Sequence, residues 1–423
     1  MLRKLIPGRV KKEIRRSITR HKANQIMALH NKLLVDVRKK KKIKVAFLLF
    51  NQSIWKYEKL YFLLKSDKRF EPVVFICPFI TYGEEVMEAE MNRSFLKFKE
   101  KGYEVRKTKI NDKEWIDVKT EYQPDLVFFT TPWQHTLQQY TIGHFLNVLT
   151  CYVPYGFNSS HLHQVHFNYD MQNFCWKVFC ETSYHKKLAQ EYSAIKGRNF
   201  VVTGYPGIDN LIDKQYNKKE VWKPQEKSKK RIIWAPHHSI PTQSNLLDYS
   251  TFLTYSEKML ELAINYQDKI QICFKPHPNL KGKLSNPKVW GKEKTETYYQ
   301  RWENLINGQL AEGDYIDLFL GSDALIHDSA SFLIEYLYVD KPVLFLIDNT
   351  QVKTQFNDLG KKVLENINLG YKNDDIVQFV EDVIQGNDEF KDKRMKLVKK
   401  ELAVPNGGFA SDNIYNYLIK QLT

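Results

Sequence analysis

The sequence contains no apolar run that approaches the ~20 residues a membrane-spanning helix needs, so we expect no spanning segment. The N-terminus is basic but lacks an apolar signal core, which argues against secretion. The chain also lacks a Cys-x-x-Cys pair and has an odd number of cysteines: Cys77, Cys151, Cys175, Cys180 and Cys273. We therefore predict reduced thiols in the core of a cytoplasmic protein, without a disulfide framework.

Acidic residues are scarce relative to basic ones. The chain has 64 Lys and Arg against 49 Asp and Glu, which gives a net charge of +15. Such an excess favours anionic partners, namely nucleic acid, an anionic membrane surface or phosphorylated substrates. A length of 423 residues with 43% hydrophobic residues fits a folded protein of two or three domains.

The N-terminal segment, residues 1–42, begins with a strongly basic sequence over residues 1–22. Apolar residues recur in it at every fourth position: Ile6, Val10, Ile14 and Ile18. One apolar stripe on a basic helix is typical of a segment that lies on an anionic bilayer. The alternative is an ordinary amphipathic helix that docks on its own domain.

Apolar, β-branched and aromatic runs alternate with helix-like stretches from Ile43 onward. The expected strands are 43–50, 72–77, 124–130, 147–153, 198–204, 231–236, 269–276, 323–328 and 341–348. The clearest expected helices are Glu84–Lys101, Phe252–Tyr266 and 411–422. A charged stretch with few aliphatic residues, 213–231, divides the pattern and is typical of a linker or an exposed connection.

Two successive β/α halves predict an α/β protein with two doubly wound parallel sheets, each a Rossmann-like domain. The predicted parts are the basic segment 1–42, an N-terminal domain 43–212, the linker 213–231, a C-terminal domain 232–405 and a C-terminal helix 406–423.

The stretch QICFKPHPNL places Lys275 and His277 directly after an apolar strand. Prolines on both sides of His277 restrict the backbone and hold this histidine at the carboxyl end of the strand. Ligands of open parallel sheets bind at that edge. We therefore predict that His277 faces a ligand.

A second candidate lies in LIHDSASFLIEYLYVDKPVLF, where a strand ends at Asp328 and a helix is expected to begin near Ser329 and Ser331. Free backbone N–H groups and serine hydroxyls at a helix start suit an anion. Glu335 lies one turn further on and is placed to accept from a sugar hydroxyl. The alternative is simple helix capping by Asp328 or Ser329, without a ligand.

The run RIIWAPHHS supplies a third candidate, since His237 and His238 follow another strand. Adjacent side chains of an extended chain point to opposite sides, so we expect at most one of the two to face a ligand. The fourth candidate is VVTGYPGIDNL, earlier in the chain, where Gly204, Pro206 and Gly207 predict a tight turn after a strand. The evidence that this turn binds phosphate is weak. Polar groups after three strands of one sheet predict a nucleotide site.

The motifs GYPGIDNL, WAP, KPHP, LIHDSASFLIEY with DKPVLF, and NGGFAS resemble, in order and spacing, those of the CDP-glycerol glycerophosphotransferase family. The likeness runs from about Asn199 to the C-terminus and implies a GT-B fold, with the two domains facing a central cleft. It also implies that His277 contacts the donor phosphates. The family's serine pair aligns with Ala330 and Ser331, and its following acid with Glu335, so one serine is lost and Ser329 is its expected substitute.

The family's Trp-His-Gly-Thr-Pro element, whose histidine is a candidate general base, corresponds here to VPYGFNSS, with Tyr155 in the histidine's place. A phenol is a poor base at neutral pH. His161 and His163 follow shortly and would share a face in an extended chain, so we expect one of them to replace the base. Zinc binding by these two with His166 is the alternative.

The favoured hypothesis is a transferase that moves a polyol phosphate, such as glycerol phosphate, from a CDP-activated donor to a polymer or lipid-linked acceptor in teichoic-acid-like or capsular synthesis. Lys275, His237, Asp328, Ser329, Ser331 and Glu335 would bind the donor, and no metal or cofactor is demanded, because fixed donors can neutralise phosphate charge. We expect a cytoplasmic enzyme, peripheral on the inner face of the membrane.

Two alternatives stay open. The first is a GT-B glycosyltransferase that uses a nucleotide sugar. The second is a non-catalytic basic protein that binds nucleic acid. Against the second, basic residues concentrate in the N-terminal segment and in 213–231 rather than interleaving with aromatic residues, so no nucleic-acid partner is expected.

Overall fold

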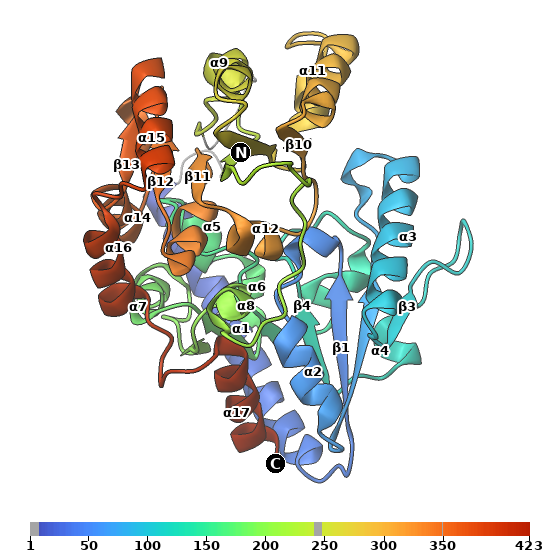
Figure 1. Ribbon diagram of the computed structural model, residues 1–423. Helices are drawn as coiled ribbons and strands as arrows, with labels where there is room; N and C mark the ends of the chain where they lie inside the picture. Colours follow the sequence, from blue (N-terminus) through green and yellow to red (C-terminus); the bar gives the residue numbers. More distant parts are fainter. Residues whose placement is uncertain (1–7, 241–247, 349) are drawn as a thin grey trace. The chain divides into compact units, whose positions relative to one another are not determined.

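The computed structural model describes residues 8–240, 248–348 and 350–423 (Figure 1). They form two compact units. The first unit contains the described part of Met1–Gly156 together with Leu162–Asp209 and Val404–Thr423, and the second contains Phe157–His161 and the described part of Asn210–Ala403. The structure therefore assigns Phe157–His161 to the second unit, although these residues lie inside the range 43–212 expected for the first.

A seven-stranded parallel sheet forms the centre of the first unit, in the order β3-β2-β1-β4-β5-β6-β7. Its central strands are buried along nearly their whole length, as expected for a parallel sheet covered on both faces. The strands are β1 (Ile43–Leu49), β2 (Phe70–Ile76), β3 (Val105–Lys107), β4 (Leu126–Phe129), β5 (Leu149–Tyr152), β6 (Lys177–Cys180) and β7 (Phe200–Val202).

The second unit is built on a six-stranded parallel sheet in the order β10-β9-β8-β11-β12-β13. Its strands are β8 (Lys230–Ala235), β9 (Ile270–Phe274), β10 (Gly308–Leu310), β11 (Ala324–His327), β12 (Val343–Leu346) and β13 (Asn368–Gly370). The strand order reverses between β8 and β11, and between β1 and β4 in the first sheet. Such reversals are the points at which doubly wound sheets bind ligands.

Each predicted strand is present, while β3, β6, β10 and β13 were not predicted. The helices of the first unit are α1 (Gly8–Val37), α2 (Glu58–Ser66), α3 (Glu84–Glu100), α4 (Val118–Glu121), α5 (His163–Phe167), α6 (Asp170–Phe174), α7 (Ser183–Tyr192) and α17 (Ala410–Leu422), and α8 (Asp209–Ile212) spans the boundary. Those of the second unit are α9 (Phe252–Asn265), α10 (Leu280–Leu284), α11 (Lys292–Asn304), α12 (Ile316–Gly321), α13 (Phe332–Glu335), α14 (Asp358–Leu364), α15 (Asn373–Gln385) and α16 (Lys391–Leu397).

Helix α1 is longer than the sequence predicted, and its two halves differ. In the second half, Ala23 and Ile26 are buried in the core of the first unit. In the first half, Val10, Ile14 and Ile18 are 46%, 46% and 63% exposed. Arg16 and Arg20 of the first half also donate to backbone carbonyls of the first unit. The helix thus docks on its own unit while the predicted apolar stripe stays exposed to solvent. Ile6 lies outside the described residues.

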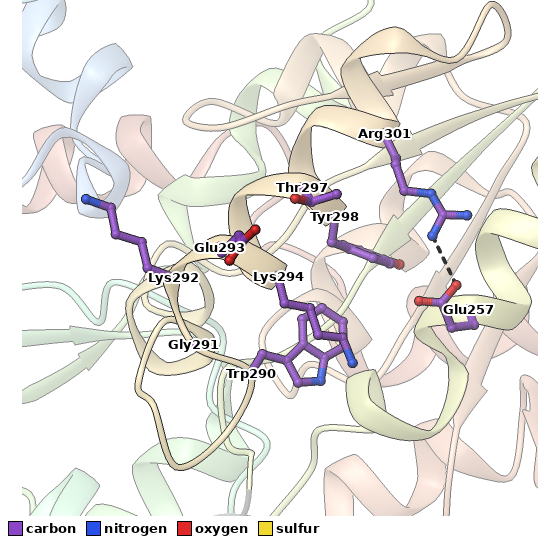
Figure 2. Close-up of a pocket in the computed structure, with 9 residues that line it drawn as sticks. All are labelled: Glu257, Trp290, Gly291, Lys292, Glu293, Lys294, Thr297, Tyr298 and Arg301. Atoms are coloured by element: carbon purple, nitrogen blue, oxygen red, sulfur yellow. Dashed lines mark hydrogen bonds and ion pairs between the residues drawn. The ribbon is translucent and has the colours of Figure 1, made fainter.

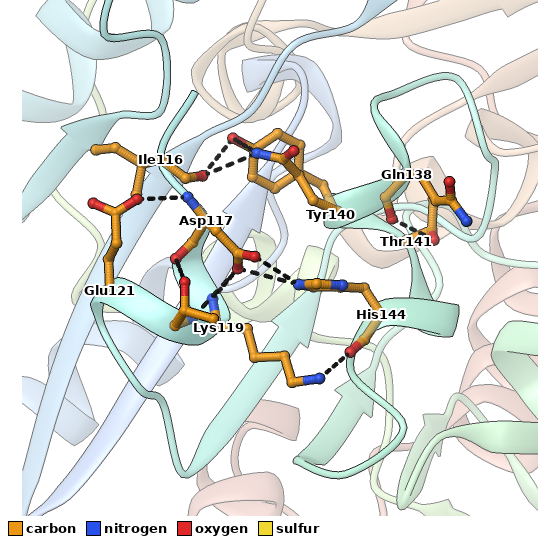
Figure 3. Close-up of polar contacts among 10 residues, drawn as sticks. Ile116, Asp117, Lys119, Glu121, Gln138, Tyr140, Thr141 and His144 are labelled. Atoms are coloured by element: carbon orange, nitrogen blue, oxygen red, sulfur yellow. Dashed lines mark hydrogen bonds and ion pairs between the residues drawn. The ribbon is translucent and has the colours of Figure 1, made fainter. Parts of the chain in front are cut away.

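Polar contacts join the segment before β4 to the segment before β5 (Figure 3). Asp117 caps α4 by accepting from the backbone N–H of Lys119 at 3.0 Å, and both carboxylate oxygens of Asp117 lie 3.1 Å from Nε2 of His144. Lys119 donates in turn to the carbonyl of His144 at 2.8 Å. These residues precede their strands, so this network braces the fold at the sheet edge opposite to the one that binds ligands.

The motif GYPGIDNL has a structural role in the first unit. The carboxylate of Asp209 is buried and accepts from the backbone N–H groups of Ala410 and Ser411, each at 2.9 Å. These groups belong to the first turn of α17, where backbone donors lack partners within the helix. The motifs GYPGIDNL and NGGFAS, about 200 residues apart, therefore meet in one contact.

The charged stretch 213–231 lies along the second unit rather than free in solvent. Trp222 is only 2% exposed, and its indole donates to the carbonyl of Leu318. The backbone N–H of Lys223 donates to the side chain of Gln309 at 2.7 Å. One buried aromatic side chain thus fixes a segment whose composition resembles that of a linker.

Among the residues that the structure describes, none of the helices has the length and apolar character of a transmembrane segment. All five cysteines are buried and carry free thiols, as the sequence predicted.

Candidate active site

Three histidine side chains meet beyond the carboxyl ends of β8 and β9. The ring centroids of His238 and His277 lie 4.2 Å apart, those of His237 and His238 4.3 Å, and those of His237 and His277 5.2 Å. Both His237 and His238 therefore approach His277. The expectation that at most one of them would do so is wrong, because the chain after β8 is not an extended strand.

Hydrogen bonds fix the tautomers of two of these rings. Nδ1 of His277 accepts from the backbone N–H of Asn279 at 3.1 Å. Nδ1 of His237 accepts from the N–H of Ser239 at 3.2 Å and lies 2.8 Å from its hydroxyl, which itself accepts from the N–H of Tyr249. A neutral imidazole whose Nδ1 accepts carries its proton on Nε2. Both rings thus offer an Nε2–H donor.

Burial keeps the histidine cluster His237, His238 and His277 neutral. Desolvation, and then the charges of its neighbours, holds the pKa of His237 and of His277 well below the usual value. Desolvation and the nearby Lys283 lower the pKa of His238 to about 4. Neutral rings that donate through Nε2 can bind an anion. A bound anion would in turn favour the protonated form of these histidines and so raise their pKa.

The same cluster is a candidate metal site by distance, because one nitrogen from each ring lies within 4.8 Å of the others. A metal would take the Nε2 lone pair and would require Nδ1–H on His237 and His277. Their Nδ1 atoms already accept backbone N–H groups. The donor set therefore fits an anion better than a metal ion.

Asp328 holds the loops around this cluster together. Its carboxylate accepts from the backbone N–H of His237 at 2.5 Å, and from the N–H and hydroxyl of Thr251 at 2.6 and 2.9 Å. Burial raises the pKa of Asp328 to about 7, against the opposing effect of these bonds. Asp328 thus ties β11 to the loop after β8 and to the start of α9, and it does not cap α13.

The serine motif follows β11. The hydroxyls of Ser329 and Ser331 lie 3.3 Å apart, and neither caps α13. Helix α13 has only four residues, so the helix dipole expected there contributes less than the sequence suggested. The buried Glu335 accepts from the phenol of Tyr315.

Lys275, which the sequence predicted to bind the donor, bonds to a carbonyl of its own unit. Its ammonium donates to the carbonyl of Gly313 at 2.9 Å, in the loop after β10. The next strand of the sheet, β11, ends in His327, which is fully buried. Its Nδ1 accepts from the N–H of Ser329 at 3.1 Å, in the same i to i+2 pattern that fixes His237 and His277.

The segment Phe157–His161 brings His161 into the second unit. The backbone N–H and Nδ1 of His161 both lie against the carbonyl of Gln355, at 2.9 and 2.8 Å. A carbonyl can only accept, so Nδ1 carries the proton and Nε2 of the neutral ring is left able to accept one. The ring is exposed. This is the tautomer that a general base requires.

His163 and Tyr155 belong to the first unit and differ from His161. His163 begins α5 and packs on the ring of Tyr192, with centroids 4.6 Å apart. The chain is therefore not extended between His161 and His163, so the premise that they share a face is wrong. Among the described residues, no metal-ligand group combines His161, His163 and His166.

The phenol of Tyr155 accepts a hydrogen bond from Trp133. The indole of Trp133 donates to its phenol oxygen at 3.0 Å. Burial raises the pKa of Tyr155 above its usual value, against the opposing effect of that bond. A phenol with a raised pKa is a weaker acid still, so Tyr155 is unsuited to act through its phenolate. No motif of the sequence indicated the contact between Tyr155 and Trp133.

Figure 2 shows a surface groove of the second unit that contains none of the predicted site residues. Arg301 pairs there with Glu257 at 3.1 Å. The groove is lined by Glu257, Trp290, Gly291, Lys292, Glu293, Lys294, Thr297, Tyr298 and Arg301. Its acidic and basic groups are mixed, in contrast to the histidine cluster, where imidazole donors gather beyond β8 and β9.

Two doubly wound parallel sheets, one with anion donors beyond the strands next to its switch point, define a GT-B protein that acts on a phosphorylated ligand. A sequence profile of the CDP-glycerol:poly(glycerophosphate) glycerophosphotransferases matches residues 154–420. The chain belongs to this family, and it is a transferase of the CDP-glycerol glycerophosphotransferase type. The resemblance seen in its motifs is confirmed.

Solved structures agree on the fold. A variant of the wall teichoic acid polymerase TagF is 14% identical, with a TM-score of 0.59, and the match covers 97% of this chain and 98% of that one. S. aureus MnaA in complex with UDP is 19% identical, with a TM-score of 0.54 and coverage of 90% and 97%. The UDP-GlcNAc 2-epimerase of Neisseria meningitidis is 16% identical, with a TM-score of 0.52 and coverage of 89% and 100%. Sequence comparison with individually curated proteins finds no match.

Proposed function

We propose that the enzyme transfers glycerol phosphate, or a closely related polyol phosphate, from a CDP-activated donor to a hydroxyl of a growing cell-surface polymer. Family membership supports the donor class. The observation that carries the proposal is the pair of Nε2–H donors on His237 and His277, beyond the neighbouring strands β8 and β9, of which β8 borders the switch point of the sheet. Ser329 and Ser331 add hydroxyl donors at the end of the next strand.

In this reaction the acceptor oxygen forms a bond to the β-phosphorus of the CDP-polyol. The bond from that phosphorus to the oxygen bridging the two phosphates breaks, and CMP leaves with the electron pair. A phosphodiester results. Transition states of this kind are stabilised mainly by fixed donors around the phosphates, and neutral imidazoles and serine hydroxyls are such donors.

The acceptor proton goes to His161 in this mechanism. Its Nδ1–H donates to the carbonyl of Gln355, which orients the ring and leaves the Nε2 lone pair available. His163 packs on Tyr192, and Tyr155 accepts from Trp133, so neither offers an equally suitable base. Among the three candidates from the sequence, His161, His163 and Tyr155, the geometry favours His161 as the general base.

The acceptor is a polymer or a lipid-linked precursor at a membrane, and the enzyme acts in the cytoplasm on the inner membrane face. The exposed stripe Val10, Ile14 and Ile18 supports this placement, because it lies on a helix that is otherwise rich in Lys and Arg. Cationic side chains near an anionic leaflet contribute about 1 kcal/mol each, so the stripe and its charges act together.

The test is a transfer assay on the full chain with CDP-glycerol and an oligomeric glycerol-phosphate acceptor. We expect release of CMP in step with acceptor lengthening, and a rise in melting temperature with CDP, because a ligand of the native state stabilises it. UDP-N-acetylglucosamine serves as the control donor. Transfer from the UDP-sugar but not from CDP-glycerol would overturn the proposal in favour of a glycosyltransferase.

A further inference from the structure

The histidine cluster has a cationic neighbour that the sequence did not single out. Lys283 lies on α10, which begins three residues after His277, and the two segments are joined by a bond from the N–H of Leu280 to the carbonyl of His277 at 2.8 Å. The charge of Lys283 contributes to the lowered pKa of each ring of the cluster, after the larger effect of burial. The ammonium therefore acts on all three rings.

The geometry of α10 explains this orientation. Leu280 and Leu284 are fully buried and fix which side of the helix meets the core. Residues of an α-helix are about 100° apart, so Lys281 and Lys283 point to nearly opposite sides. Lys281 pairs with Glu296 of α11 at 3.0 Å, on one side. Lys283 is left on the other side, that of the histidine cluster.

Lys283 lacks a counter-charge among the described residues. It is half-buried, and among the residues that the structure describes it has no ion pair and no side-chain hydrogen bond. Burial lowers its pKa. The carboxyl that touches this region, Asp328, accepts from His237 and Thr251 instead. A partly desolvated cation without a partner is unfavourable unless a ligand supplies the opposite charge.

His238 points to the same conclusion independently. Its Nδ1 is buried and has no hydrogen-bond partner among the described residues. Buried polar atoms are nearly always paired, so an exception in a ligand-binding region requires an explanation. A ligand that lies between His238 and the Nε2–H donors of His237 and His277 would satisfy this atom.

We propose that Lys283 and His238 complete a diphosphate-binding site with His237 and His277, and that Lys283 supplies the cation that neutralises the ligand. This inference rests on the proposed function for the identity of the donor, but the ligand group it names is the diphosphate itself. Lys283 provides this positive charge from α10, a segment other than the one that carries His237 and His238.

The test measures the binding of inorganic pyrophosphate to the full chain by calorimetry. Lys283→Met removes the charge and keeps the length of the side chain, and we expect its dissociation constant to rise about 10- to 100-fold, as for loss of a charge-assisted contact. Lys281→Met is the matched control on the same helix and should bind within about twofold of the wild type, because its charge belongs to a surface ion pair. Lys283→Arg should recover most of the affinity.

Steady-state kinetics with CDP-glycerol give a second readout. We expect Lys283→Met to raise KM more than it lowers kcat. The melting temperature of the ligand-free protein should not fall, because the charge that is removed has no partner there. Pyrophosphate affinity that is equal in wild type and Lys283→Met, or lost equally in Lys281→Met, overturns the inference. If Lys283 controls pyrophosphate binding but CDP-glycerol is not a donor, the inference stands and the proposed function fails. If CDP-glycerol is a donor and Lys283→Met behaves as wild type, the proposed function stands and the inference about Lys283 fails.

Discussion

The hydroxyl of Ser159 donates to the backbone carbonyl of Ala330 at 2.8 Å. Ala330 lies between the two serines that follow β11, and Ser159 lies two residues before His161. The backbone N–H of Asn357 donates to the carbonyl of Ser159 at 2.8 Å and holds the segment from its other side. The proposed base is thus attached to the same unit as the proposed phosphate donors, through contacts that do not involve the first unit.

We expect His161→Ala to lower turnover by about 10²- to 10⁴-fold, the usual contribution of a general base. The variant should also lose the part of the pH dependence of the rate that comes from protonation of the base. His163→Ala and Tyr155→Phe are the comparisons and should retain most of the activity, since one ring packs on Tyr192 and the other accepts from Trp133. The measurement is CMP release as a function of pH. Normal turnover in His161→Ala together with a dead Tyr155→Phe would mean that the assignment is wrong.

We expect His277→Ala to abolish transfer while leaving the fold intact. The ring lies in a loop after β9 and donates through Nε2, so its removal takes away a phosphate donor without touching the strand core. His144→Ala is a control, because that histidine belongs to the network before β5 in the first unit. CMP release and the melting temperature should be measured together. A folded His277→Ala protein with wild-type turnover removes His277 from the mechanism.

The histidine cluster makes stability depend on pH in a definite direction. The pKa of His238 falls from 6.5 to about 4 on folding. The unfolded chain therefore binds more protons between these values, so this group destabilises the fold as pH falls from about 6.5 towards 4 and has no effect above that range. The free energy of unfolding of the wild type should fall between pH 7.5 and 4.5. In His238→Gln this fall should be smaller by about 1–2 kcal/mol, after allowance for the partial exposure of His238. Urea unfolding at the two pH values measures this, and an identical pH dependence in both proteins would contradict it.

The exposed stripe of α1 gives a prediction about membranes. We expect the double substitution Ile14→Glu and Ile18→Glu to weaken binding to vesicles with anionic lipid by roughly 10- to 100-fold, because burial of each isoleucine contributes about 1.5–3 kcal/mol at most. Val35→Glu changes a 52% exposed residue of the docked half of the same helix and should bind like the wild type. Vesicle co-sedimentation measures the difference. If the double variant sediments as fully as Val35→Glu, α1 is not the membrane anchor.

The contact of Asp209 with α17 can be tested by denaturation. Asp209→Ala leaves the N–H groups of Ala410 and Ser411 buried without an acceptor, and we expect a loss of about 1–2 kcal/mol in the free energy of unfolding. Asp412→Ala removes another acidic side chain from the first turn of α17 and should cost less, since no backbone N–H bonds to it in the described structure. Urea midpoints at pH 7.5 give the comparison; equal midpoints for both variants would show that the contact is not stabilising.

Most of the strands that the sequence predicted lie in apolar, β-branched or aromatic runs and are buried, such as Ile43–Leu49. Strand β10 was missed because Gly308 and Gln309 are weak strand formers. Strand β6, Lys177–Cys180, is as long as several predicted strands and was overlooked. Period and composition identify an element only when it is long enough to show a pattern. The motif residues His237, His277 and Ser329 were found because prolines and strand ends mark them.

Other parts of the site depend on contacts that a sequence does not display. Lys283 is one of several lysines on a short helix, and nothing in its spacing separates it from Lys281, whose charge is paired. The approach of His238 to His277 depends on the irregular path of the chain after β8. The transfer of Phe157–His161 to the second unit depends on a bridge between Ser160 and Phe356, nearly 200 residues apart.

The return of α17 to the first unit has a consequence for the synthesis of the protein. The chain leaves the first unit after Asp209 and rejoins it at Val404, so every strand of the second sheet is translated before α17 exists. Until then Asp209 faces no helix, and the surfaces of α2 and α1 that contact α17 are uncovered. A ribosome therefore completes the second unit while the first still exposes apolar surface. Chaperones that bind apolar surface would therefore bind the first unit during synthesis, although its strands are translated before those of the second unit.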